Sequence, residues 1–71
     1  MNLRDVELGV LKTVSAVVVE DEELRGFLFS LGCFEGEPIT VISRRRSGMV
    51  VAIKDGRYSI DNALAEAILV I

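Results

Sequence analysis

Histidine and tryptophan are absent from this sequence of 71 residues, and cysteine and proline occur once each, at Cys33 and Pro38. A single cysteine excludes a disulfide within the chain. Without histidine it also excludes a Cys/His zinc site, which needs about four such ligands, and a lone thiol makes a poor ferrous site. No Ser–His pair and no phosphate-binding loop is present either. The sequence therefore indicates a protein without catalytic activity, cofactor or metal.

Long apolar runs and an excess of basic residues are missing as well. No run approaches the roughly 18 to 20 residues that span a bilayer, so membrane insertion is not expected. The formal net charge of -3 argues against a general nucleic-acid binder. Arg4, Asp5 and Glu7 interrupt the start of the chain, where a signal peptide would be apolar. Together with the lone cysteine, this predicts a cytoplasmic protein.

Apolar residues are abundant, at 51% of the chain, and are mostly valine, isoleucine and leucine. Because no disulfide or metal can stabilise so short a chain, its stability must come from burying these side chains. No linker, repeat or low-complexity stretch is visible. We therefore expect residues 1–71 to form a single domain.

Segments rich in β-branched residues alternate with turn residues along the chain. They predict strands at residues 12–19, 39–43, 49–54, 57–60 and 67–71. A helix is expected from a cap at Asp21 to about Leu31, and one helical turn at residues 61–66. The pattern indicates a mainly β fold, a small closed or nearly closed barrel of about five strands. One short helix follows its first long strand, and the helical turn precedes its last strand.

The expected helix has an apolar stripe, because Leu24, Phe27, Leu28 and Leu31 are spaced i, i+3, i+4 and i+7. We expect this stripe to pack into the core. Gly32 is the expected left-handed stop at the end of the helix. The acidic residues 20–23 are best explained as a helix start, where the dipole favours negative charge; a cation site is the weaker alternative.

Turn residues separate the expected strands. Gly36 and Pro38 bracket the entry into the strand at 39–43, and residues 44–48, which end at Gly48, form a polar, basic connection. Asp55 and Gly56 are the strongest hairpin signal, because a type I′ turn needs positive φ at both central residues. Residues 1–10 are expected to be a short lead-in with a turn at Gly9.

The order of these glycines and apolar residues resembles the FeoA family of ferrous iron transport accessory proteins. The matching positions are Leu28, Leu31, Gly32, Cys33, Gly36, Ile39 and Val41, followed by Gly48, Gly56, Ile60, Ala65, Ile68 and Val70. The resemblance covers residues 3–71. It implies an SH3-like barrel without catalytic activity. It also implies action beside the membrane ferrous-iron transporter that carries a G-protein domain, the FeoB type, at the cytoplasmic side of the inner membrane.

Two departures from the family pattern concern local shape. Cys33 stands where the family usually has a larger aliphatic residue, which affects the packing there. The basic connection lacks the proline often found before its glycine, which affects the shape of that hairpin tip.

The candidate partner-binding residues lie at the end of the helix. Phe29 projects opposite the apolar stripe, on the side of Arg25, so it is either an exposed contact or is covered by a loop such as residues 1–10. Cys33 and Phe34 follow the helix stop, and the core is the better expectation for both. No base or cation near Cys33 in the sequence would activate its thiol.

A second candidate is the basic run Arg44, Arg45 and Arg46. It is either a docking patch for an acidic partner or lipid surface, or a solvated hairpin tip that protects a strand end. Three charges are fewer than the four to eight typical of lipid-binding clusters.

Other functions compete with transporter docking. Similar SH3-like domains form the C-terminal part of iron-dependent transcriptional repressors. A DNA-binding domain should precede a domain of that kind, whereas this chain starts at its own methionine. A polyproline-binding SH3 module needs several exposed aromatic residues, and this chain has three Phe and one Tyr. The apolar edge at residues 67–71 could pair between copies, so a homodimer stays open.

Overall fold

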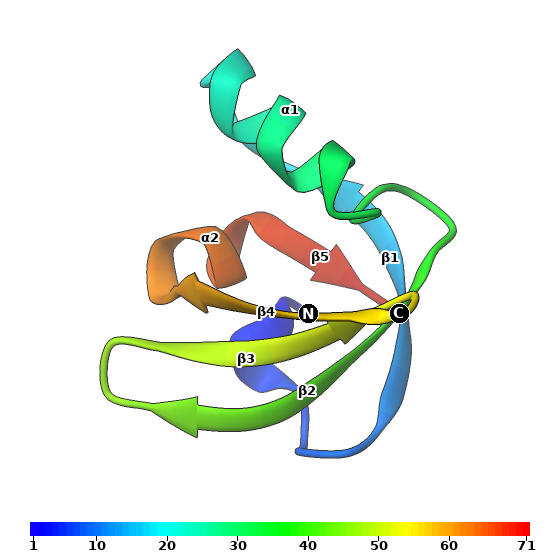
Figure 1. Cartoon of the computed structure of the whole chain (residues 1–71), viewed down its shortest axis with the longest axis vertical. Helices are drawn as coiled ribbons and strands as arrows, with labels where there is room; N and C mark the ends of the chain where they lie inside the picture. Colours follow the sequence, from blue (N-terminus) through cyan, green and yellow to red (C-terminus); the bar gives the residue numbers. More distant parts are fainter.

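The computed structural model describes every residue of the chain, 1–71. Its elements, in chain order, are a 3₁₀ helix η1 (Leu3–Asp5), β1 (Leu11–Val17), α1 (Glu22–Ser30), β2 (Pro38–Arg45), β3 (Gly48–Ile53), β4 (Gly56–Asp61), α2 (Asn62–Ala67) and β5 (Ile68–Val70) (Figure 1). All the predicted strands and both predicted helices are present. None of the helices is long and apolar enough to span a membrane.

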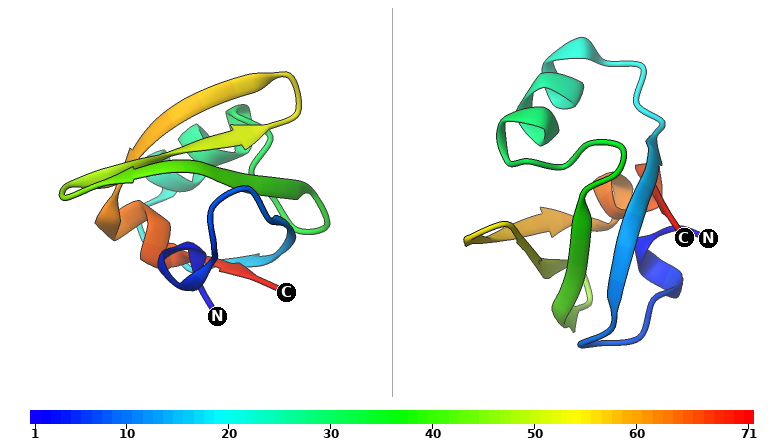
Figure 2. Two further views of the ribbon diagram at one scale, coloured as in Figure 1. Left: turned by 90° about the horizontal axis from the view of Figure 1, so that it is seen from below. Right: turned by 90° about the vertical axis from the view of Figure 1, so that its right-hand side faces the viewer.

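The five strands form one antiparallel sheet in the order β4-β3-β2-β1-β5. The register shifts between Val14 and Ala16 where β1 pairs with β5, and between Val41 and Ser43 where β2 pairs with β3. Such bulges bend strands, and the sheet curls strongly, so that β2, β3 and β4 cross over β1 and β5 (Figure 2). β4 and β5 are the two edges, joined through α2. The sheet is therefore a barrel that is not fully closed.

The core fills the inside of this curl. Its 15 residues come from every strand, from α1 and α2, from the N-terminal segment and from the loops that flank α1: Leu3, Val6, Val14, Val19, Leu28, Cys33, Ile39, Val41, Met49, Val51, Ile53, Ile60, Ala65, Ile68 and Val70. In β3 and β4 the buried residues alternate with more exposed ones, as one-sided strands require. Residues 1–10 contribute Leu3 and Val6 to the core, while Leu8 and Val10 are exposed. Residues 1–10 therefore form part of the core of the curled sheet.

The predicted ends of α1 are confirmed. The Asp21 carboxylate accepts hydrogen bonds from the backbone N–H groups of Glu23, at 2.8 Å, and Leu24, at 3.4 Å. At the other end Gly32 has a φ of +92°, the left-handed conformation that glycine adopts without strain. A Cβ at this position would also lie 2.9 Å from the side chain of Lys54, so the chain after the helix approaches β3 closely.

The prediction that the whole apolar stripe of α1 packs into the core is wrong. Leu28 alone is buried, Leu31 is half-buried, and Leu24 and Phe27 remain 41% and 47% exposed. The reason is the position of the helix. α1 projects beyond the sheet, and only its last turn reaches the core (Figure 1). The other end of the stripe faces space that no part of the chain fills.

The turns differ from expectation at one hairpin. The β3–β4 turn consists of Lys54 and Asp55, because Ile53 pairs with Gly56. Positive φ falls on Lys54, at 53°, and on neither Asp55 nor Gly56, so the predicted type I′ turn at 55–56 is wrong. Gly36 keeps its expected turn role, with φ +91°. Gly48 is required for space, since a Cβ there would lie 2.1 Å from the carbonyl oxygen of Ile60.

The segment before the last strand forms the expected helical turn. Asp61 caps α2 by accepting a hydrogen bond from the backbone N–H of Leu64 at 2.8 Å. The strand boundaries differ by a few residues from those predicted. β1 ends at Val17, so Val18 and Val19 lie beyond it, and β2 extends through Arg45.

Candidate docking surface

The most exposed aromatic ring of the chain stands at the end of α1. Phe29 is 63% exposed, so residues 1–10 do not cover it. Its ring centroid lies 4.8 Å from that of Phe34, with the planes inclined by 33°, within the range of favourable aromatic pairs. The two residues flank the Gly32 turn, which brings them to the same side. The pair forms a fixed apolar ridge beside the curled sheet.

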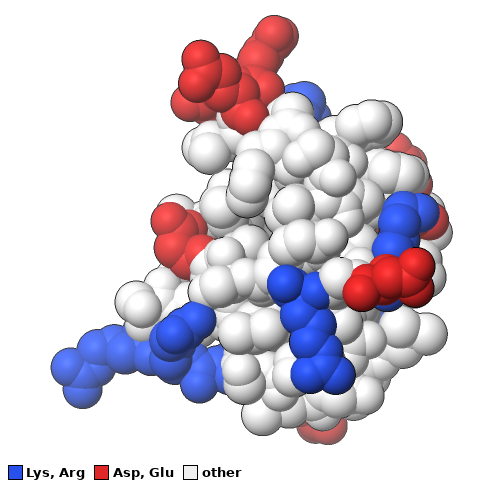
Figure 3. All heavy atoms as spheres, viewed as in Figure 1, with Lys and Arg blue, Asp and Glu red and all other residues white.

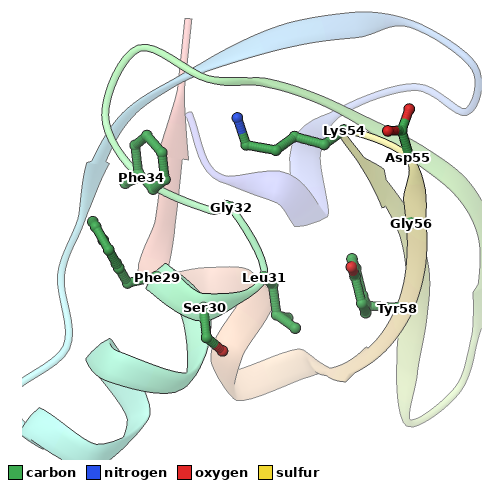
Figure 4. Close-up of a pocket in the computed structure, with 9 residues that line it drawn as sticks. All are labelled: Phe29, Ser30, Leu31, Gly32, Phe34, Lys54, Asp55, Gly56 and Tyr58. Carbon is green, nitrogen blue, oxygen red and sulfur yellow. The ribbon is translucent and has the colours of Figure 1, made fainter.

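Hollows lie on both sides of this aromatic pair. The larger, of about 470 Å³, opens between the end of α1 and the β3–β4 turn (Figure 4). It is lined by Phe29, Ser30, Leu31, Gly32, Phe34, Lys54, Asp55, Gly56 and Tyr58. The two phenylalanines lie on one side of it and Tyr58 on the other. The smaller hollow, of about 240 Å³, is lined by Val17, Arg25, Phe29, Cys33, Phe34 and Glu35.

Phe34 was expected in the core, and this prediction is wrong. It is half-buried, and the Lys54 ammonium stands 5.5 Å from its ring centroid, a cation–π contact. Lys54 also forms an ion pair with Glu37. The β3–β4 turn is thereby tied to the loop after α1. Phe34 thus lies between Phe29 and Lys54 at the surface, whereas the preceding residue, Cys33, is buried.

Cys33 is buried, as expected, with 2% of its surface exposed. Burial raises the pKa of its thiol to about 11, because the thiolate would lose its hydration there. The thiol is therefore protonated at neutral pH and poorly nucleophilic. Nowhere in the chain do three or more His, Cys, Asp or Glu side chains gather in a way that could hold a metal ion.

Arg25 has partners within the chain. Its guanidinium donates hydrogen bonds to the carbonyl oxygens of Val17, at 3.2 Å, and Val19. These bonds tie the first half of α1 to the segment that follows β1. Arg25 therefore positions the helix that carries Phe29, and its role in partner binding stays a prediction.

The three consecutive arginines have three different environments. Arg44 and Arg45 belong to β2, and only Arg46 lies in the turn, so the predicted basic connection is shorter than expected. The guanidinium of Arg44 donates hydrogen bonds to the carbonyl oxygens of Leu3, at 2.9 Å, of Arg4, at 3.3 Å, and of Val6.

Arg45 donates to the Ser59 hydroxyl at 2.7 Å, whereas the Arg46 side chain has no partner in the chain. Basic atoms gather over the far end of the β2–β3 hairpin, away from the aromatic pair (Figure 3). The run therefore divides into one arginine that fastens the N-terminal segment and two at the hairpin end.

Sequence reasoning missed Lys54 and Tyr58 as parts of this surface. Both lie more than 19 residues from the aromatic pair in sequence, and the closure of the sheet brings them to the same hollow. The tight turn before Gly56 was the available signal, since a hairpin tip carries its flanking side chains together.

Comparisons with known proteins agree on the fold. FeoA of Stenotrophomonas maltophilia, complexed with zinc and described as a procaryotic SH3 domain protein, has a TM-score of 0.87 at 18% identity, over 100% of this chain and 89% of that one. An iron uptake regulatory protein (FeoA) has a TM-score of 0.84 at 22% identity, over 99% and 93%. A manganese-dependent transcriptional repressor has a TM-score of 0.89 at 23% identity, over 100% of this chain and 40% of the repressor.

At these identities the likeness establishes the fold, which is SH3-like. No curated protein matches the chain by sequence. The family model described as FeoA domain matches residues 1–71. Because that match covers the whole sequence, the chain belongs to the FeoA family.

Proposed function

We propose that this chain is a non-catalytic accessory protein of ferrous iron uptake. It docks on the cytoplasmic part of a FeoB-type transporter and regulates the assembly or activity of that transporter. The protein is cytoplasmic and peripheral to the inner membrane through this partner. Membership of the FeoA family supports the iron-uptake role, as does the zinc-bound relative, for which a role as a bacterial ferrous iron transport activating factor has been suggested.

The observation that carries the docking role is the exposed aromatic pair. Phe29 keeps 63% of its surface in contact with solvent although it stacks on Phe34. Aromatic side chains are over-represented among the residues that dominate binding energy, particularly when they are rigid before binding. The Phe29 ring already packs against Phe34, which is in turn in contact with Lys54, so the pair is partly ordered before a partner covers it.

The proposal is tested by titrating the purified chain against the soluble cytoplasmic domain of the FeoB-type transporter from the same organism. Phe29→Arg should weaken binding at least tenfold, because the ridge loses its apolar anchor and stacking partner. Leu11→Arg is the matched control. Leu11 is 68% exposed, but it lies at the start of β1, at the opposite end of the molecule from α1.

Three results are informative. Loss of binding in a folded Phe29→Arg variant, with Leu11→Arg unchanged, supports both the role and the face. If Phe29→Arg binds like the native chain, the ridge is not the contact, and Arg45 and Arg46 become the next residues to change. If the native chain does not bind with nucleotide absent, with GDP or with GTP, docking on this domain is wrong.

A regulatory domain related to the C-terminal part of iron-dependent repressors is the second candidate. The observation that favours it is the TM-score of 0.89 with a manganese-dependent repressor. It predicts that the transporter domain stays unbound in the same titration. A homo-oligomerising module would instead show a mass above one chain in light scattering.

A further inference from the structure

A separate apolar groove lies on the side of α1 that faces α2. Its volume is about 260 Å³, and six of its seven lining residues are apolar: Val18, Val19, Leu24, Ala63, Leu64 and Ala67, with Asp61 at the edge. This volume is below the roughly 300 to 1,000 Å³ of small-molecule pockets. The groove is suited to a few apolar side chains of a macromolecule.

Exposed apolar side chains line this groove and continue along α1, although other exposed apolar residues lie elsewhere on the chain. Val18 is 63% and Leu24 41% exposed, and Phe27, one turn along α1 from Leu24, is 47% exposed. These residues come from adjacent parts of the structure, whereas single exposed apolar residues are scattered on most proteins. The stripe that the sequence marks for burial is thus left half uncovered. A partner bound at this stripe would bury the apolar surface that the rest of the chain leaves exposed.

The groove offers side chains and no free strand edge. The backbone N–H of Val18 donates to Ala67 at 2.8 Å, and the carbonyls of Val17 and Val19 accept from Arg25. Both walls are helices, whose central backbone groups are bonded internally. An extended segment could not add to the sheet here. An amphipathic helix, which contacts a groove through spaced apolar side chains, fits this arrangement.

The charged residues at the edge of the groove and at the start of α1 are acidic, and the neighbouring Arg25 is engaged with the carbonyl oxygens of Val17 and Val19. Residues 20–23, all acidic and all exposed, stand at the start of α1, and Asp61 stands at the edge of the other wall. No Lys or Arg lines the groove. In Figure 3 acidic atoms over the start of α1 are separated by an uncharged strip from a second acidic group lower on the same side. A second copy would bring the same acidic residues against these, whereas a basic partner would be attracted.

We propose that the groove between α1 and α2 binds an amphipathic helix of the partner, which inserts apolar side chains beside Leu24 and places Lys or Arg against residues 20–23. This rests on the proposed function, since the partner is the transporter's cytoplasmic domain. The aromatic ridge and the groove then lie on different sides of α1. The partner therefore contacts α1 on two sides, at the ridge and at the groove.

Leu24→Asp tests the apolar part in the same titration with the transporter's cytoplasmic domain. Binding should weaken about tenfold or more, because a charge replaces an apolar side chain in the groove. Leu24 lies in the first turn of α1, where an acidic residue is compatible with the helix dipole, so the fold should be retained. Circular dichroism and the thermal midpoint check this. Leu8→Asp, at a site 53% exposed and outside the groove, is the control.

A triple variant tests the charges. Glu20→Gln, Glu22→Gln and Glu23→Gln together keep the Asp21 cap and remove three negative charges. Native binding should weaken as salt rises, and the triple variant should show weaker binding with a shallower dependence on salt.

The outcomes separate the two proposals. If Leu24→Asp binds like the native chain while Phe29→Arg does not, the groove inference is overturned and the docking role stands. If binding by the triple variant depends on salt as strongly as binding by the native chain, the proposal that the partner helix carries Lys or Arg opposite residues 20–23 is overturned. If the native chain self-associates and Leu24→Asp abolishes this, a second copy covers the groove and the inference is wrong. If the native chain fails to bind at all, both proposals fall.

Discussion

The curled sheet and the projecting helix α1 use the same kinds of side chain with opposite results. In β3 four residues of six are buried, whereas in α1 Leu28 is the single buried residue of nine. The inward-facing apolar side chains of the sheet are buried against other residues of the same chain. α1 is held by its last turn, by Arg25 and by the loop that carries Phe34. A short helix is not stable through propensity alone, so an uncovered helix of this length is a place where a partner can contribute binding energy.

The largest effect is expected from a change inside the sheet. Ile39→Ala removes a side chain that is 1% exposed at the start of β2. The lost burial and the cavity left behind should lower the free energy of unfolding by about 2–5 kcal/mol. Urea unfolding followed by circular dichroism measures this. A loss below about 1 kcal/mol would mean that the curl is less tightly packed than its burial indicates.

An effect of intermediate size is expected from pH, through Cys33. Its folded pKa of about 11 lies above the ordinary value of 9.0, so above pH 9 the unfolded chain loses the thiol proton first. The unfolded state then binds fewer protons than the folded state, and stability should fall as pH rises from about 9 to 11, by about 2 kcal/mol.

Unfolding of the native chain and of Cys33→Ala across this range provides the measurement. The alanine variant should show a smaller fall, because the remaining loss comes from other groups. Equal falls in both chains would contradict a thiol that is protonated by burial.

The smallest effect is expected from α1. Phe27→Ala should lower the free energy of unfolding by about 1 kcal/mol or less, since Phe27 is already 47% exposed and alanine has the higher helix propensity. The same urea experiment applies, with Ile39→Ala as the reference. A loss comparable to that of Ile39→Ala would show that α1 is an integral part of the core, and the contrast between the two regions would disappear.

Several local features of the fold were predicted correctly from the sequence, and one turn was not. Asp21, Gly32 and Gly36 act as predicted, because caps and left-handed turns depend on a few neighbouring residues. The buried alternation of β3 follows from the period of a strand. Lys54 was not predicted as a turn residue, because the register of β3 and β4 places the two-residue turn one position before the Asp–Gly pair.

The candidate site was predictable in part. Helical periodicity places Phe29 opposite the stripe of Leu28, but whether residues 1–10 covered its ring was left open until the structure showed it exposed. Its pairing with Phe34 needed the geometry of the Gly32 turn. The different environments of Arg44, Arg45 and Arg46 could not be predicted from three identical residues in a row, since Arg44 and Arg45 bond to residues at least 14 positions away and the Arg46 side chain has no partner.

The sequence by itself determined the elements of this protein, because strand alternation, helix caps and glycine turns are set by interactions between near neighbours. It determined the family as well, through the spacing of its glycines and apolar residues. The tertiary structure decided which apolar side chains are covered. Leu28 is buried and Leu24 is not, although both belong to one stripe, because burial depends on how far the curled sheet reaches along the helix.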